Sequence, residues 1–393
     1  MAQSISQEAI GATGLPGATA ASRYAGATTS GAPTTGTFAV GDYVVDQTGA
    51  MYVCTVAGTP GTWQLSGVSV NENIAGKNFV INGGMDIWQR GTSFSTSSGN
   101  IYTADRFCFT SGGNAATVSQ VTSGLTGFQY AHRVQRNSGT SGTAGMYLAE
   151  SLETKNSIPM AGQTVTWSFW ARAGANYSQS GSTLYVQLVT GTGTDQNVLV
   201  SYTGQASPIN TVVGITTSWQ KFTFTTPIAS TVTEIAPLWA QIPTGTAGAN
   251  DYFDITGVQL EIAPQATPFS RAGGSIGGEL ALCQRYYITN NSALATSTYT
   301  SFAIGVASAS YVDCHFYLPQ QMRTTPTLFA SAASTFQVGI LGLSGSTVTS
   351  IAIQQSNPFH VVVSMYASVN SYYPYELFAN NNNTSYIAFS AEL

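Results

Sequence analysis

The chain has 393 residues, of which only 7% are Asp, Glu, Lys or Arg, and its formal net charge is −5. This charged fraction is far below the roughly one quarter that is typical of globular proteins. The chain also has 18 Phe, 20 Tyr and 6 Trp, which excludes a disordered protein because disordered sequences are poor in aromatic residues. The negative charge and the scarcity of Lys and Arg exclude nucleic acid as a partner, because phosphate binding needs clustered basic residues.

The length predicts two or three domains, and the composition predicts a surface of hydroxyl and amide groups. After Arg323 the sequence contains no Lys or Arg, and its carboxylates are Glu376 and Glu392. Solubility normally depends on net charge, so a monomer with this surface would self-associate. We therefore predict a permanent oligomer, a homotrimer.

No apolar run approaches the roughly 18 to 20 residues of a membrane-spanning helix. The first ten residues, MAQSISQEAI, lack the basic and apolar regions of a signal peptide. We expect neither membrane insertion nor export. The cysteines lie far apart and show neither a zinc-site nor a disulfide spacing, so we expect buried thiols; they are Cys54, Cys108, Cys283 and Cys314.

Residues 1–36 are rich in Gly, Ala, Ser and Thr and predict an extended attachment or linker segment. Residues 11–19 contain Gly-x-y triplets, too few for a stable collagen triple helix. Residues 37–67 predict a small hairpin module: strands at 43–46 and 51–55 flank a Gly-containing loop. Trp63 is positioned to close over the hairpin.

Residues 68–270 contain short β-runs separated by Gly, Ser and Asn clusters, which predicts a β-sandwich. Its clearest strands are 165–170, 184–189, 219–225 and 252–262. Residues 271–283 predict a flexible linker, although 279–287 could hold one or two helical turns. Residues 284–393 predict a second β-sandwich, with strands at 299–307, 310–318, 335–341, 347–354, 359–367 and 384–391. The whole chain is expected to be all-β.

One C-terminal strand alternates strictly. Apolar side chains at Val312, Cys314, Phe316 and Leu318 alternate with Tyr311, Asp313, His315 and Tyr317. Successive side chains on a strand point to opposite faces, so this strand should bury one face and present the other to water or a ligand.

No catalytic centre is predicted. Glycosidases use two carboxyl groups on either side of a sugar bond, but the acid pairs Glu150/Glu153 and Asp251/Asp254 lack neighbours that mark a site, and we expect ordinary surface or loop-capping roles. Residues 273–277 fit a G-x-S-x-G pattern without the strand-to-helix elbow that a serine hydrolase needs. His132, His315 and His360 fall in no metal-binding motif.

Two blocks of sequence resemble a known family. The first is NFVINGGMDIWQRGTSFSTSSGNIYTADRF at 78–107, and the second is FDITGVQLEIAPQATPFSRAGGSIGGELALCQRYY at 253–287. They resemble the opening and the closing of a module that recurs in bacteriophage fibre and tail proteins. The resemblance implies a jelly-roll, carbohydrate-binding-like domain in a virion fibre or adhesin. The hairpin module similarly resembles small modules near the bases of phage fibres.

The resemblance also implies roles for particular residues. The WQRG and ADR motifs, with Trp88, Arg90 and Arg106, would belong to the framework of the fold, and Asp105 or Asp86 would pair with an arginine across the strands. Jelly-roll sugar-binding modules often hold a structural calcium ion. Asp86 and Asp254 are candidate ligands, although ordinary polar pairing is the stronger expectation because no EF-hand-like loop is present. No other cofactor is expected.

Aromatic residues are the best candidates for ligand contact. Sugars stack their apolar faces on aromatic rings, while amides and hydroxyls bind their hydroxyl groups. Strand alternation places Trp167 in the core and Trp170 on a mixed face, and we expect Tyr185 and Gln187 on a comparable face of the next strand. The alternative contact surface is C-terminal, through Tyr311, His315 and Tyr317 or through the loop 372–375.

These observations lead to one functional hypothesis and two rivals. The favoured hypothesis is a trimeric phage fibre protein, attached to other virion proteins through its N-terminal segment and assembled in the host cytoplasm, that binds host-surface glycan without cleaving it. The first rival is a purely architectural decoration protein of the capsid or tail. The second is a polysaccharide-depolymerising tailspike, which would be expected to contain a long repeated β-solenoid.

Overall fold

The structure is a computed structural model. It describes residues 23–393 with the exception of 48, 67–73, 292–298 and 341–344. The Gly-x-y triplets predicted at 11–19 lie outside the described residues. The chain divides into two compact units, Met1–Glu72 and Asn73–Leu393. Within the described part, helices long and apolar enough to cross a membrane are absent.

The first unit contains one four-stranded sheet in the order β1-β2-β3-β4. The predicted hairpin is present as β2 and β3, paired antiparallel. Trp63 closes over the hairpin and packs edge-on against Phe38, with the two ring centroids 4.8 Å apart. In the described part of the predicted linker segment 1–36, a strand pairs parallel with β2 and so belongs to the sheet of this unit. The strands are β1 (Tyr24–Thr28), β2 (Tyr43–Asp46), β3 (Met51–Val56) and β4 (Thr62–Leu65).

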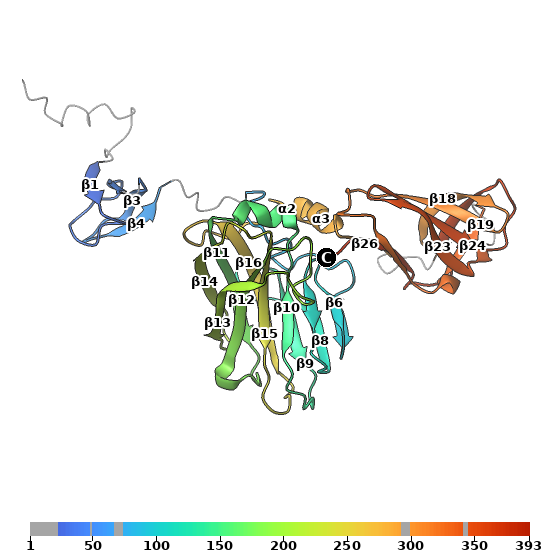
Figure 1. The fold of residues 1–393 in the computed structure, drawn as a ribbon, viewed down its shortest axis with the longest axis horizontal. Helices are drawn as coiled ribbons and strands as arrows, with labels where there is room; N and C mark the ends of the chain where they lie inside the picture. The colour runs from blue at the N-terminus through green and yellow to red at the C-terminus, as the bar shows by residue number, and fades with distance from the viewer. Residues whose placement is uncertain (1–22, 48, 67–73, 292–298, 341–344) are drawn as a thin grey trace, which may run out of the picture. The chain divides into compact units, whose positions relative to one another are not determined.

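The second unit begins with a sandwich of two six-stranded sheets (Figure 1), which confirms the predicted jelly-roll class. One sheet has the order β14-β11-β16-β9-β8-β5 and is called here the Trp170 sheet. The other has the order β13-β12-β15-β10-β7-β6. The strands are β5 (Ser93–Thr96), β6 (Asn100–Tyr102), β7 (Cys108–Thr110), β8 (Ala116–Thr122), β9 (Tyr130–Arg136), β10 (Met146–Ala149), β11 (Thr164–Ala173), β12 (Thr183–Gly191), β13 (Ala206–Gly214), β14 (Gln220–Pro227), β15 (Glu234–Gln241) and β16 (Tyr252–Ile262).

An aromatic cluster holds the two sheets together. Trp167 and Phe169 of β11 reach between the sheets and meet Trp239 of β15, at ring-centroid distances of 5.2 and 5.4 Å. All three side chains are fully buried. The period-2 pattern of the sequence therefore predicted the inward face of β11 correctly, because burial of these large rings fixes which face turns inward.

The segment between the two sandwiches is not the flexible linker predicted at 271–283. It contains α3 (Ile276–Gln284), whose N-cap Ser275 accepts a hydrogen bond from the Gly278 N–H. Glu279 is buried and accepts the Gly273 N–H at 2.7 Å, and Cys283 packs in a small apolar cluster. Shorter helical segments are α2 (Thr154–Ser157) and the 3₁₀ turns η1 (Ile158–Met160), η2 (Ser180–Ser182) and η3 (Ala333–Thr335).

The C-terminal part is the predicted second sandwich. A three-stranded sheet, β17-β26-β20, packs on a seven-stranded sheet, β22-β21-β25-β18-β19-β24-β23. Phe389 of the first meets Phe316 of the second at 5.3 Å. The strands are β17 (Tyr287–Asn291), β18 (Ser301–Ser308), β19 (Tyr311–Tyr317), β20 (Thr327–Ala330), β21 (Phe336–Gly339), β22 (Ser346–Thr347), β23 (Ser350–Asn357), β24 (His360–Tyr366), β25 (Pro374–Ala379) and β26 (Tyr386–Ser390).

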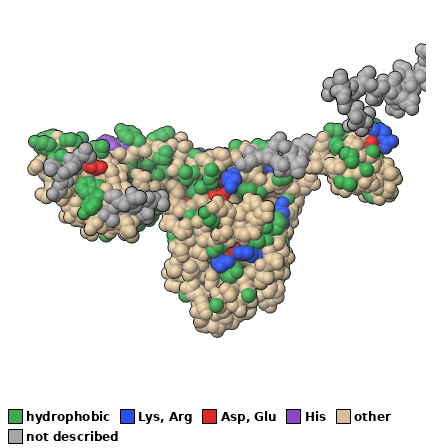
Figure 2. Space-filling view, turned by 180° about the vertical axis from the view of Figure 1, so that it is seen from behind, with side chains coloured by type: hydrophobic (Ala, Val, Ile, Leu, Met, Phe, Trp, Pro, Cys, Tyr) green, Lys and Arg blue, Asp and Glu red, His purple; other side chains and the backbone are tan. Residues whose placement is uncertain are grey.

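The few charged residues are mostly used inside the protein. Each of the nine arginines lies within ion-pair distance of a carboxylate. Figure 2 shows the result: on the face in view, acidic and basic side chains occupy small, separated areas of a largely neutral surface. All four cysteines are buried free thiols, as predicted.

Arg136 and Asp251 form the most deeply buried of these pairs. Both side chains are fully buried, 2.8 Å apart, and Arg136 also donates to the carbonyl oxygens of Gly142 and Gly245. Asp251→Ala would leave an unpaired cation in the interior. Loss of one partner of such a pair costs about 3–5 kcal/mol, and we expect a fall of this size in the free energy of unfolding, measured by urea denaturation.

The control is Lys155→Ala. The Lys155 side chain is 65% exposed and lies 4.0 Å from Glu153, so its loss should change stability little. If Asp251→Ala were no more destabilising than Lys155→Ala, the buried pair would not be a main support of the sandwich.

Candidate functional site

The two sequence blocks that carry the family resemblance contact each other in the structure. The Arg90 guanidinium lies 3.6 Å from the centre of the Tyr287 ring, and the Arg106 guanidinium lies 3.6 Å from the centre of the Tyr286 ring. Gln89 donates to the Tyr287 carbonyl oxygen at 2.7 Å. The WQRG and ADR motifs therefore fasten the jelly-roll to the segment that begins the C-terminal sandwich.

A carboxylate from the last strand region completes this junction. Glu392 accepts from Arg90 at 3.1 Å and also from Arg106. Arg323 donates to the Ala391 and Glu392 carbonyl oxygens. The junction thus brings together charged groups from the first and last parts of the second unit.

The acidic residues of the motifs pair with arginines, as the resemblance implied. Asp86 accepts two hydrogen bonds from Arg271, at 3.1 and 2.8 Å. Asp105 lies 3.9 Å from Arg90 and accepts the Gln89 N–H at 2.9 Å. Burial raises the pKa of Asp105 above its usual range, and Arg90 and Gln89 oppose this shift.

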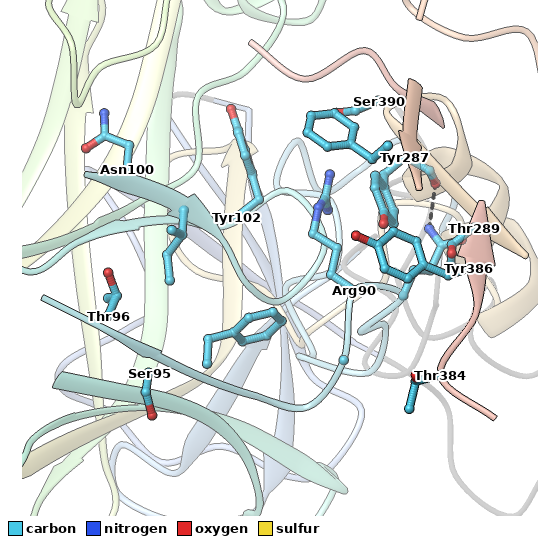
Figure 3. A pocket seen from close by; sticks show the side chains of 15 residues that line it. Arg90, Ser95, Thr96, Asn100, Tyr102, Tyr287, Thr289, Thr384, Tyr386 and Ser390 are labelled. Atoms are coloured by element: carbon cyan, nitrogen blue, oxygen red, sulfur yellow. Dashed lines mark hydrogen bonds between the residues drawn. The ribbon is translucent and has the colours of Figure 1, made fainter. Parts of the chain in front are cut away.

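Beside the junction lies a cleft of about 930 Å³, which we call the junction cleft. One wall comes from the jelly-roll edge strands β5 and β6, and the other comes from the three-stranded sheet. Figure 3 shows Arg90 between the Tyr102 ring and the rings of Tyr287 and Tyr386. The lining residues are Gln89, Arg90, Gly91, Phe94, Ser95, Thr96, Asn100, Ile101, Tyr102, Tyr287, Thr289, Phe329, Thr384, Tyr386 and Ser390.

The junction cleft offers aromatic faces together with hydroxyl and amide groups. Of its lining residues, five are aromatic, five carry aliphatic hydroxyls and two carry amides. Arg90 is the single charged residue among them, and its charge is met by Glu392. Burial raises the pKa of Tyr102 above its usual range, so its hydroxyl stays a donor to the Leu393 oxygen. The cleft suits a neutral ligand with both apolar faces and hydroxyl groups.

Trp170 lies on the outer face of the Trp170 sheet, half-buried, as predicted. It stands opposite Lys221 of β14. A bulge in β16 brings Gly257 beneath Trp170, and Gly257 has a φ of +61. A Cβ atom on Gly257 would lie 2.6 Å from Phe128 and 3.0 Å from Trp170. Only glycine therefore fits under this pair of rings. Contact of Trp170 with a ligand stays a prediction.

Tyr185 and Gln187 do not share a face with Trp170. They lie on β12, which belongs to the opposite sheet, and their neighbours Leu184 and Val186 fill the core. Gln187 instead bonds Asn210 on β13 at 3.0 Å. The prediction of a comparable face was wrong, because strands that follow one another in the sequence here cross from one sheet of the sandwich to the other. These three residues do not form one site.

Tyr311, His315 and Tyr317 lie together on the outer face of β19. The intervening Val312, Cys314 and Phe316 are buried, so the predicted alternation is confirmed. Tyr317 is 80% exposed. The predicted loop 372–375 ends in β25, and its Tyr372 is 90% exposed with φ +70.

Asp86 and Asp254 do not fit a calcium site. Arg133 binds both carboxylate oxygens of Asp254, and Arg172 binds one of them as well, at 2.8–3.0 Å. Asp86 is held by Arg271. Calcium needs six to eight oxygen ligands free of competing cations, and among the described residues no group of three or more possible metal-binding side chains occurs.

The two acid pairs considered for catalysis have structural partners. Glu153 is fully buried and pairs with Arg285 at 2.9 Å. Asp251 and Asp254 are buried with their arginines. The expectation of surface positions was wrong, because all four carboxylates are buried. A loop-capping role is present at Asp251, which accepts the Ser178 N–H at 2.9 Å. Ser275 of the G-x-S-x-G pattern caps α3.

No protein-family model and no curated protein matches the chain. Among solved structures, a CBM4 structure is 17% identical and covers 50% of this chain and 100% of its own, with a TM-score of 0.31. The enzymatically active domain of tailspike protein 4 of bacteriophage CBA120 is 13% identical and covers 48% of this chain and 22% of its own, with a TM-score of 0.29.

A third structure, TmCBM61 in complex with beta-1,4-galactotriose, is 11% identical and covers 47% of this chain and 99% of its own, with a TM-score of 0.27. With TM-scores below 0.5, these likenesses do not establish a shared function.

Glu150 yields a testable pH dependence. It is 1% exposed, and one carboxylate oxygen accepts the Ile81 N–H at 3.0 Å. Burial raises the pKa of Glu150 from its usual value of 4.5 to about 8, and the charge of Arg106 opposes this shift. Because this pKa is raised in the folded protein, the contribution of Glu150 to stability is fully present below about pH 4.5. That contribution is lost as the pH rises through about 8.

We therefore expect the free energy of unfolding of the wild type to fall between pH 5 and pH 9 by more than that of Glu150→Gln, which keeps an acceptor for Ile81 but cannot ionise. Urea denaturation at pH 5, 7 and 9 measures the difference between the two proteins. Glu279 and Asp105, whose pKa values burial also raises, are present in both proteins and cancel. A constant difference across this range would contradict the assignment.

Proposed function

We propose that this protein is a trimeric fibre protein of a bacteriophage virion that binds host-surface glycan without cleaving it. The junction cleft carries the proposal. It is large enough for a ligand of a few sugar rings, since ligand sites commonly occupy about 300–1,000 Å³. Its lining combines ring faces with hydroxyl and amide groups.

The chemistry of the lining favours a neutral saccharide. Aromatic rings bind the apolar faces of sugars, and side-chain amides and hydroxyls exchange hydrogen bonds with sugar hydroxyls. Phe329 is 50% exposed, so one aromatic face is accessible at the cleft. A glycosidase would need two carboxyl groups on either side of the bond, and none of the described lining residues is Asp or Glu.

The origin in a phage virion rests on the two motif blocks at 78–107 and 253–287. Their mutual contacts explain why such motifs would recur together: they build one junction. Attachment to other virion proteins through the N-terminal segment belongs to the same proposal.

The first test removes an accessible ring from the cleft. Phe329→Ala should weaken binding to host cells, because a stacked aromatic contact contributes about 1 kcal/mol, or roughly a fivefold change per site. Three copies acting together should enlarge the loss. Fluorescent wild-type and variant proteins are compared for adsorption, with Phe359→Ala, a 58% exposed ring outside the cleft, as the matched control.

Trp170→Ala is the second arm of this test. If it reduces adsorption and Phe329→Ala does not, the glycan lies on the Trp170 sheet and the cleft proposal is wrong. If the wild type adsorbs and neither variant changes adsorption, the C-terminal surface of Tyr311, His315 and Tyr317 or the loop 372–375 is favoured; if the wild type does not adsorb, the architectural role is favoured. Incubation of purified envelope polysaccharide with the wild type should leave its size unchanged, and release of shorter chains would favour the depolymerase.

An exposed apolar face on the C-terminal sandwich supports trimer formation. The seven-stranded sheet exposes apolar side chains on its outer face, with Ile304 69% and Val306 58% exposed, in a region that lacks Lys and Arg after Arg323. Association of copies would cover such a surface. We expect light scattering at micromolar concentration to give three times the chain mass, and a stable monomer would contradict the proposal.

A further inference from the structure

Two of the three histidines in the chain meet on one open sheet face. His315 lies on β19 and His360 on the neighbouring antiparallel strand β24, where His315 stands opposite Val362 and His360 opposite Tyr317. His315 Nδ1 is 3.1 Å from His360 Nε2. His315 is exposed and His360 is half-buried, whereas the third histidine, His132, is fully buried in the jelly-roll.

The two rings approach each other through their nitrogens. Their centroids are 5.1 Å apart and their planes differ by 21°. With the two nitrogens 3.1 Å apart, the ring centroids are farthest from each other when both nitrogens lie on the line between them. The observed centroid separation is close to that limit, so the nitrogens lie between the rings. Two imidazole nitrogens bound to one tetrahedral ion, each at about 2.0–2.1 Å, are separated by about 3.3 Å. The separation of the two nitrogens therefore already suits two ligands of one metal ion, and rotation of the side chains would turn both lone pairs from each other toward the ion.

The surroundings suit a cation. The Tyr317 ring packs against His360, with centroids 4.6 Å apart and planes at 25°, which limits the orientations of that imidazole. Asp313, two residues before His315 on the same face of β19, is the nearest acid along the strand and accepts from Ser364. Neither β19 nor residues 324–393 contain Lys or Arg, so β24 and its neighbours β19 and β23 bring no basic side chain to repel a metal ion.

We propose that His315 and His360 together bind one divalent ion of the class that prefers imidazole, such as Zn²⁺, Ni²⁺ or Cu²⁺. The ion replaces the proton that the two nitrogens share, and water or another donor fills its remaining positions. It bridges β19 and β24 and so stabilises the folded sheet, because an ion bound only by the folded state raises stability by mass action. The proposal is independent of glycan binding.

The test uses the full chain, prepared without a histidine tag and dialysed against a chelator. Titration with Ni²⁺ or Zn²⁺ should show one ion per chain and a higher melting temperature with metal. Loss of a group that supports a metal ligand already weakens binding about tenfold or more. Loss of a ligand itself, in His315→Gln or His360→Gln, should therefore weaken binding at least about tenfold and remove the melting shift.

Gln355→Ala, a change on the neighbouring strand β23 that leaves both imidazoles in place, should bind like the wild type. The two histidine variants are independent, so misfolding of one, detected by circular dichroism, leaves the other as the test. Equal affinity of the wild type and a folded histidine variant, or no binding by the wild type, would overturn the proposal. A pair that is only hydrogen-bonded would give lower variant stability with no response to metal.

Discussion

Two arginines, each lying against a tyrosine ring and sharing one carboxylate, hold the second unit together. Arg90 and Arg106 extend from the jelly-roll, Tyr286 and Tyr287 follow α3, and Glu392 lies just after the last strand. An unpaired guanidinium this deeply buried would be costly. The arrangement stabilises only when all three segments are in place, so it couples the folding of the jelly-roll to that of the C-terminal sandwich.

The junction cleft is a consequence of this coupling. Its two walls come from different sandwiches, and Arg90 is both a member of the junction and a lining residue. The rings that line the cleft are thus positioned by the same contacts that join the domains. A glycan bound there would contact residues from both sandwiches, which means that binding and domain joining depend on one set of side chains.

Local patterns predicted much of the fold. The alternation on β11 correctly predicts that Trp167 faces the core and Trp170 the outer side, because burial of large rings fixes the face of a strand. β25 was missed because Pro374 and its neighbouring tyrosines resemble a turn. The helix α3 begins in a glycine-rich stretch that is typical of a linker, and buried Glu279 supplies its anchoring contacts only once the chain is folded.

The candidate site could not be predicted in the same way. Arg90 and Tyr287 are 197 positions apart by their numbers, and single-sequence periodicity contains no information on which edge of one sandwich meets another. The WQRG and ADR motifs were the available signal, but the resemblance assigns them to the framework of the fold and not to a site. For Tyr185, the missing information was which sheet of the sandwich the strand joins.

The pairing of every arginine with a carboxylate has a consequence for how this protein would meet its targets. With every arginine paired, only a net charge of −5 over 393 residues is left to extend a field from the surface, so encounters are steered weakly over long range. Association should then proceed at the slower rates of neutral partners, about 10⁵–10⁶ per molar per second. In return, it should depend little on the ionic strength of the medium, because salt screens exposed charges and leaves ring stacking and buried pairs almost unchanged. Such a surface would work alike in fresh and in saline water.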